Sequence, residues 1–373
     1  MKKNALLIIL SFLISITVLG QETKIKNQDL SNIFPKPKVD KRIELVSIVA
    51  RLAGYQEYNE DYCKTYTKDI HSYFDKFKNH PLISLASKLR MENGIGFDAV
   101  MKIAFHINQP PKLTPKVEFN SDIPESRWGK DNALKFLELL RDFYVVSEFE
   151  KFYNDHADLY SITEERFLPI YKTLNIDWYN QYYGINPNGS FNVIIGLGNG
   201  GSNYGGKVIY PDKKEDVYAI MGTWIVDSTN LPVYKNENYF PTLVHEFNHS
   251  FVNPLIDKFS NQLENYGKAI YKLSKGNMRR QSYGTWKSMM YESLVRASVI
   301  RYLLKNDSYQ TATNQLIEEI GNGFYWMQEL VNLLYDYENN RSKYPTLENF
   351  MPVIVDFYDK IAKESETMYE IKK

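Results

Sequence analysis

Hydrophobic residues recur at helical spacing through the first half of the chain. In residues 42–53 (RIELVSIVARLA) apolar side chains follow the i, i+3, i+4, i+7 pattern, which stops at Gly54. Residues 161–164 (SITE) have the spacing of a capping box and predict the start of a further helix. Residues 39–185 are therefore expected to form a helical N-terminal lobe. Its helices are predicted at residues 42–53, 58–78, 81–92, 96–107, 131–146 and 162–182.

The pattern changes near Asn186. Short apolar runs at residues 191–196, 207–210 and 216–221 predict three strands, with Gly and Asn clustered between the first two. Helical spacing then returns, and the chain is expected to be α+β and predominantly helical, with a small sheet within 191–224. The helices of this second part, residues 186–373, are predicted at residues 241–253, 259–273, 285–305, 309–320, 323–338 and 346–364.

The first 20 residues have the pattern of a secretory signal peptide. Lys2 and Lys3 precede an apolar run over residues 5–18, and short residues follow at the end of this run. Cleavage is expected between Gly20 and Gln21. The alternative is an uncleaved anchor, but the apolar run is short for a membrane span. The sequence therefore predicts a secreted or periplasmic protein, with residues 21–38 as a lead-in tail.

Charge and cysteine content exclude several classes of protein. The 45 basic and 45 acidic residues give a formal net charge of zero, without a block of like charge, so neither nucleic acid nor an anionic membrane is an expected partner. No later stretch is long enough to span a membrane. Cys63 is the only cysteine, so no internal disulfide can form. We expect it to be a buried apolar group rather than a catalytic thiol.

Residues 245–249 (HEFNH) carry the most specific chemical pattern in the chain, HExxH. On a helix, His245 and His249 lie one turn apart on one face, so both imidazoles can bind one Zn²⁺. Glu246 then projects beside the metal and can take a proton from its bound water, whose pKa zinc lowers to about 7. Pro241 suits the first turn of this helix, and Pro254 limits its extension.

A catalytic zinc site needs a third protein ligand. A third histidine ten residues after His245 is excluded, because Leu255 stands there. Glu292 is the best candidate, since a carboxylate on the apolar face of a helix needs a metal or an ionic partner. The alternative is a salt bridge with Arg296 one turn later, which is compatible with metal binding. Asp257 and Glu264 are the fallback ligands.

The helix-borne HExxH with a distal glutamate resembles the gluzincin zinc metallopeptidases. The string 245–254 (HEFNHSFVNP), with RIEL at 42–45 and RLAG at 51–54, is more similar to a group of secreted proteins regarded as peptidases and filed as a domain of unknown function. The resemblance covers most of the mature chain and implies a zincin-like catalytic part over residues 186–373. It also implies that His245, His249 and Glu292 are zinc ligands and that Glu246 is the general base.

The sequence departs from the gluzincin pattern around the third ligand. In the best-known members an Asn precedes this glutamate and an Asp follows four residues later, whereas Tyr291 and Arg296 stand here. Asn253 is a candidate substitute for the missing support of a zinc histidine. The resemblance further implies that substrate adds a strand to a sheet edge, which we expect at residues 216–224. Tyr283 and Tyr291 are the candidate oxyanion donors.

These features predict a secreted zinc metallopeptidase that acts on a peptide or protein substrate. The alternatives are a secreted binding protein with a structural or inactive zinc site and a zinc hydrolase of non-peptide substrates. Residues 196–201 (GLGNGG) satisfy GxGxxG, but a strand follows them instead of the helix that a dinucleotide site needs. We interpret them as a hairpin loop.

Overall fold

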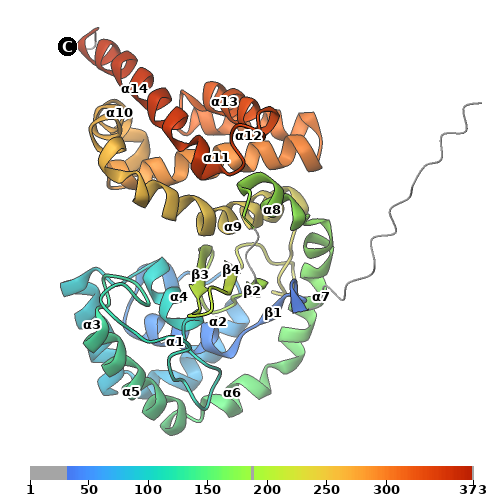
Figure 1. Cartoon of the computed structure of the whole chain (residues 1–373). Helices are drawn as coiled ribbons and strands as arrows, with labels where there is room; N and C mark the ends of the chain where they lie inside the picture. Colours follow the sequence, from blue (N-terminus) through green and yellow to red (C-terminus); the bar gives the residue numbers. More distant parts are fainter. Residues whose placement is uncertain (1–31, 186–188, 372–373) are drawn as a thin grey trace, which may run out of the picture. The chain divides into compact units, whose positions relative to one another are not determined.

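The computed structural model describes residues 32–185 and 189–371 (Figure 1). The predicted signal peptide, its cleavage site and most of the predicted lead-in tail lie outside these residues. The described part is predominantly helical with one small mixed sheet, which confirms the α+β prediction. It belongs to one compact unit, and no helix within it is long and apolar enough to cross a membrane.

Residues 41–183 form eight α-helices. The first, α1, is buried along nearly its whole length, and Asp40 caps it by accepting a hydrogen bond from the backbone N–H of Arg42. His80 caps α3 in the same way, and Gly94 ends α3 in a left-handed conformation. The bounds are α1 Lys41–Leu52, α2 Lys64–Phe74, α3 Pro81–Asn93, α4 Asp98–Phe105, α5 Lys130–Val146, α6 Phe149–Asp155, α7 Ala157–Thr173 and α8 Asp177–Tyr183, with 3₁₀ turns at Gln56–Tyr58 and Asp75–Phe77.

The predicted helix start at residues 161–164 is wrong. Ser161 lies inside α7, where the helix has already begun, so its hydroxyl cannot cap free N–H groups. Glu164 instead accepts a hydrogen bond from the backbone N–H of Val39, 2.9 Å away. The single helix predicted at 162–182 is also divided, because the chain turns extended at Leu174 before α8 begins.

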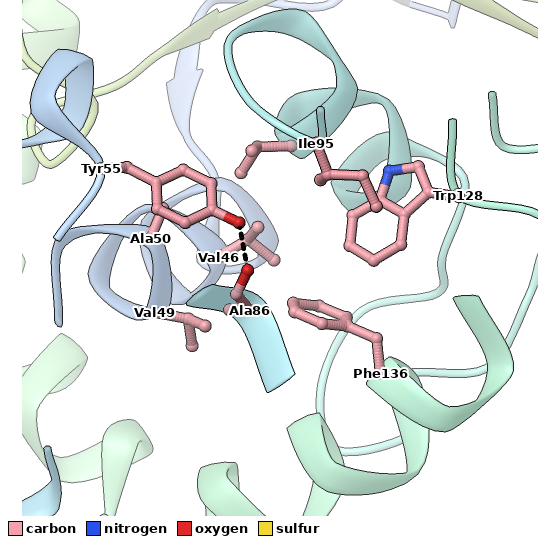
Figure 2. A pocket seen from close by; sticks show the side chains of 9 residues that line it. Val46, Val49, Ala50, Tyr55, Ala86, Ile95, Trp128 and Phe136 are labelled. Atoms are coloured by element: carbon pink, nitrogen blue, oxygen red, sulfur yellow. Dashed lines mark hydrogen bonds between the residues drawn. The ribbon is translucent and has the colours of Figure 1, made fainter. Parts of the chain in front are cut away.

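Helices α1, α3, α4 and α5 pack around a small apolar cavity (Figure 2). All the side chains that line it are buried, and its volume is about 10 Å³, close to the minimum of about 10–15 Å³ that one water needs. The hydroxyl of Tyr55 points across it and donates a hydrogen bond to the carbonyl of Ala86. The lining residues are Val46, Val49, Ala50, Tyr55, Ala86, Ile95, Val100, Trp128 and Phe136.

The sheet has four strands in the order β1-β2-β4-β3. β1 Lys38–Val39, β2 Phe191–Ile195 and β4 Glu215–Met221 run parallel, and β3 Tyr204–Ile209 is antiparallel to β4. β4 is therefore an interior strand, and the prediction that residues 216–224 form the sheet edge is wrong. The edge next to β4 is β3. The loop at 196–203 joins β2 to β3 across β4, so it is not the hairpin that we expected.

The end of the predicted lead-in tail belongs to the fold. β1 pairs with β2, and the carbonyl of Ile33 accepts a hydrogen bond from the N–H of Phe191 at 2.7 Å. Phe34 is buried and stacks on Tyr171 with ring centroids 4.2 Å apart. Residues 33–39 therefore bind the first edge of the sheet.

The second group of helices begins with α9, which lies between the sheet and α11 (Figure 1). Pro241 and Pro254 are both inside α9, so they neither begin nor end it as predicted. Each proline removes one backbone hydrogen bond, and buried side chains on both flanks, such as Phe240 and Ile256, hold the helix together. The bounds are α9 Asn236–Lys258, α10 Ser260–Arg280, α11 Trp286–Asn306, α12 Tyr309–Gly321, α13 Met327–Asn339 and α14 Leu347–Ile371.

Candidate metal centre

Helix α9 presents two histidines to one point. His245 and His249 lie one turn apart, and their Nε2 atoms are 3.0 Å from each other. The rings meet edge to face with centroids 4.7 Å apart, and both side chains are partly buried. Their convergence follows from the helical period, which the sequence motif predicted.

Helix α11 brings the third candidate ligand. Thr285 caps its first turn, and Glu292 faces α9 with its residue only 7% exposed. The Oε2 atom of Glu292 is 3.4 Å from Nε2 of His245, and Oε1 is 3.5 Å from Nε2 of His249. One ligand atom from each residue therefore lies within 4.8 Å of the other two, and the three residues could hold a metal ion.

The two fallback ligands lie elsewhere. Asp257 accepts a hydrogen bond from Tyr291 and pairs with Lys287 at 2.6 Å. Glu264 pairs with Lys268 within α10. Neither carboxylate joins the cluster of His245, His249 and Glu292.

The spacing of the three donor atoms fits a small divalent ion. Zinc binds His nitrogen and carboxylate oxygen at about 2.0–2.2 Å, and tetrahedral geometry then places neighbouring ligand atoms about 3.3 Å apart. The two imidazole nitrogens are 3.0 Å apart, and each lies 3.4 or 3.5 Å from a different oxygen of the Glu292 carboxylate, which is close to this value. Two imidazoles and one carboxylate are also a donor set that zinc favours.

Asn253 orients His249. The Nδ1 atom of His249 lies 3.1 Å from Oδ1 of Asn253, an acceptor, so Nδ1 carries the proton in this arrangement. The Nε2 atom on the other side of the ring points at His245 and Glu292. An outer hydrogen bond of this kind is typical of metal-binding histidines.

Arg296 holds the carboxylate of Glu292. Its Nε donates to Oε2 of Glu292 at 3.2 Å, and its other two nitrogens donate to Glu319 of α12 and to the hydroxyl of Tyr283, the latter at 2.8 Å. The salt bridge between Glu292 and Arg296 thus exists beside the metal cluster, as the sequence allowed. Glu319 was not predicted, because nothing in its helical surroundings distinguishes it from a solvent-facing glutamate.

Glu246 is buried on the side of α9 that packs against β3 of the sheet. Its residue is 6% exposed, and the N–H of Gly205 on β3 hydrogen-bonds to its carboxylate. Burial, followed by the negative charges of Glu292 and Asp98, raises the pKa of Glu246 well above its usual value. A Cβ atom at Gly205 would lie 1.9 Å from the carbonyl oxygen of Glu246, so only glycine allows this close approach of strand and helix.

The pKa values of the ligand candidates favour the forms that bind metal. Burial lowers the pKa of His245 to about 3, so its imidazole is neutral at neutral pH. Burial alone would raise the pKa of Glu292, but the histidines and Arg296 outweigh it and lower the value to about 2. A neutral imidazole and an ionised carboxylate are the states that a metal ion requires.

A polar cleft opens beside the cluster. It is formed by the first half of α9 together with α11 and α12, and its volume is about 320 Å³, at the lower end of the usual range for ligand pockets. His245 and Glu246 form part of its wall, next to Arg296 and Glu319. A ligand in this cleft would therefore lie beside Glu246 and beside His245, one of the three candidate metal ligands.

The two candidate oxyanion donors have different surroundings. The hydroxyl of Tyr283 hydrogen-bonds with Arg296 and with Glu292, which places it at the cluster. Tyr291 is bound to Asp257 instead. The loop that contains GLGNGG also has a structural partner, because the carboxylate of Glu44 accepts hydrogen bonds from the N–H groups of Leu197 and Gly198. The carboxyl group of Glu44 thus already binds the N–H groups that a nucleotide phosphate would need.

These observations define an α+β protein with a helix-borne His-His-Glu cluster that could hold a metal ion. The sequence profile of one family, described as Domain of unknown function (DUF4932), matches residues 37–357, and the chain belongs to that family. No curated protein and no solved structure matches the chain.

Proposed function

We propose that the protein is a zinc-dependent metallopeptidase of the gluzincin type. The observation that carries the proposal is the convergence of His245, His249 and Glu292 beside the buried Glu246. His245, His249 and Glu292 would bind the ion as the three protein ligands that a catalytic zinc site needs, which leaves a further position for water or substrate. Bound zinc would polarise the substrate carbonyl and lower the pKa of a coordinated water to about 7.

The residues of this chain supply the proton transfers. Glu246 accepts a proton from the attacking water and then delivers it to the nitrogen of the leaving amine as the peptide bond breaks. A raised pKa suits this double role, because the group must both bind and release the proton near neutral pH. Tyr283, whose hydroxyl lies at the cluster, would donate a hydrogen bond to the carbonyl oxygen during attack by turning its proton away from Glu292.

Strand β3 supports a peptide as substrate. It is the sheet edge that lies against α9, and its Gly205 contacts Glu246 directly. An extended peptide can add to such an edge through main-chain hydrogen bonds and so place its carbonyl near the metal. The N-terminal 20 residues support export, so we infer a peptide or protein substrate outside the cytoplasm.

The Glu246→Gln variant tests the mechanism. Gln keeps the size of the side chain but cannot accept the proton, so we expect zinc content equal to wild type and cleavage of a denatured protein lowered by about 10²–10⁴-fold. Zinc content and cleavage are measured on the same zinc-loaded samples. Full cleavage by the zinc-bound variant would contradict the role of Glu246. If zinc-loaded wild type cleaves nothing while chelation lowers its melting temperature, the metal is structural.

A further inference from the structure

The polar cleft beside the metal centre has an unbalanced negative charge. Glu237, Glu318 and Glu319 all line it, in addition to Glu246. Among the described residues that line it, Arg296 is the only lysine or arginine. The charge balance of the cleft therefore depends on which carboxylates Arg296 pairs with.

Arg296 is already committed to other groups. It forms ion pairs with Glu292 and Glu319, and its remaining nitrogen donates to Tyr283. Glu319 is satisfied further by the side-chain amides of Gln315 and Asn322. This network satisfies the hydrogen bonds of Glu319 and links α11 to α12, but the single guanidinium is shared by two carboxylates, so one negative charge is left.

Glu237 and Glu318 are left without a counterion. Neither carboxylate has a hydrogen bond or an ion pair within residues 32–185 and 189–371, and both are exposed to the cleft solvent. The walls near them also include the apolar Pro241 and Val299. The cleft thus offers apolar surface for a side-chain stem and two free carboxylates for its end.

Glu237 lies near the start of α9, away from Glu246. Glu237 precedes Glu246 by two and a half turns, which is about 13 Å along the helix axis at 1.5 Å per residue. A charge at the cleaved bond itself would therefore lie far from Glu237, whereas a lysine or arginine side chain that points along the cleft brings its charge closer to Glu237 and Glu318. Both side chains bury an apolar stem while they keep a charged end in contact with carboxylates.

We infer that this cleft is a specificity pocket for a lysine or arginine side chain next to the cleaved peptide bond. The inference rests on the proposed peptidase function and adds the class of substrate. Glu237 and Glu318 recognise the positive charge, and Pro241 and Val299 contact the stem. Glu246 and His245, which share the same wall, keep the bond beside the metal.

The test uses zinc-loaded protein and quenched peptides that differ at one residue beside the cleaved bond. Lysine and arginine are compared with norleucine, a neutral side chain of similar length, and with glutamate. Exposed ion pairs contribute little each, so we expect kcat/KM for lysine to exceed that for norleucine by about tenfold, with a smaller ratio at high salt. The Glu237→Gln/Glu318→Gln variant should lose this ratio, while Glu138→Gln on the distant α5 should keep it.

The outcomes separate the pocket from the peptidase activity. Cleavage without preference for lysine, or a preference that survives in the double variant, overturns the pocket and leaves the peptidase proposal standing. Peptide hydroxamates with lysine or norleucine are also titrated by calorimetry. If no peptide is cleaved but the lysine hydroxamate binds about tenfold tighter, the pocket stands and the peptidase proposal fails. Cleavage that needs a free N-terminal amine, whatever the side chain, overturns the assignment to lysine and arginine.

Discussion

Two cavities within the described residues have opposite character: one arises from the packing of the core, and the other lies beside the candidate metal centre. The cavity among α1, α3, α4 and α5 is apolar and has a volume of about 10 Å³ (Figure 2). The cleft beside His245 has a volume of about 320 Å³ and is lined mostly by polar side chains. The first is a small imperfection of close packing. The second has two buried carboxylates, Glu246 and Glu319, and two exposed carboxylates without a counterion, Glu237 and Glu318, so it is not explained by packing alone.

The largest effect on stability is expected in the apolar cavity. Phe136→Ala would enlarge it and remove a side chain that is 3% exposed, so we expect a loss of about 3–5 kcal/mol in the free energy of unfolding. Zinc affinity, measured on folded protein, should stay at the wild-type value. Val145→Ala on the same helix is the control, because Val145 is 67% exposed. A changed zinc affinity in Phe136→Ala would show that the apolar cavity and the candidate metal centre are not independent.

A second effect concerns a buried carboxylate outside the cleft, Glu44. Burial outweighs its hydrogen bonds from Leu197, Gly198 and Tyr66 and raises its pKa to about 7. The folded state therefore binds this proton more tightly than the unfolded state, so the stability that Glu44 contributes is present below about pH 4.5 and is lost as the pH rises through about 7. The loss is on the order of 3 kcal/mol.

Urea titrations between pH 4.5 and 8 measure this loss. Glu44→Gln should have a flatter stability profile than wild type across this range, and the exposed Glu165→Gln should match wild type. Equal slopes for Glu44→Gln and wild type would show that Glu44 does not titrate there. Zinc affinity should be the same in all three proteins if metal chemistry is confined to the cleft.

The smallest of the three effects concerns Arg296, in the wall of the cleft. Arg296 positions Glu292, and loss of such an outer partner lowers metal affinity by about 10–100-fold. Arg296→Met should show this decrease in competition with a chromophoric chelator. Arg301→Met is the matched control, since Arg301 lies on the same helix but pairs with Glu338. Equal zinc affinities of the two variants would contradict a positioning role for Arg296.

Local patterns predicted the parts of the site that depend on a single helix. His245 and His249 converge because of the helical period, and Glu292 was found because a carboxylate on an apolar helix face needs a partner. The roles of Glu319 and Gly205 depend on how α12 and β3 pack beside the site, which spacing along the chain does not encode.

For the fold as well, local features could be predicted from the sequence, whereas the packing between elements could not. The helical and strand segments were recognisable from hydrophobic spacing, but their neighbours were not. Residues 216–224 were expected at the sheet edge because they directly precede the metal helix, yet β4 pairs on both sides. The pattern at residues 161–164 was only a local coincidence, since Ser161 lies inside α7 and the partner of Glu164 is Val39, far away in sequence.

The position of the metal tests the central claim most directly. Crystals of the zinc-loaded protein, measured at energies above and below the zinc absorption edge, would locate the ion without reference to activity. We predict one zinc ion within about 2.0–2.2 Å of Nε2 of His245, Nε2 of His249 and a carboxylate oxygen of Glu292. Zinc bound elsewhere, or no anomalous peak between these three residues in zinc-saturated protein, would contradict the account.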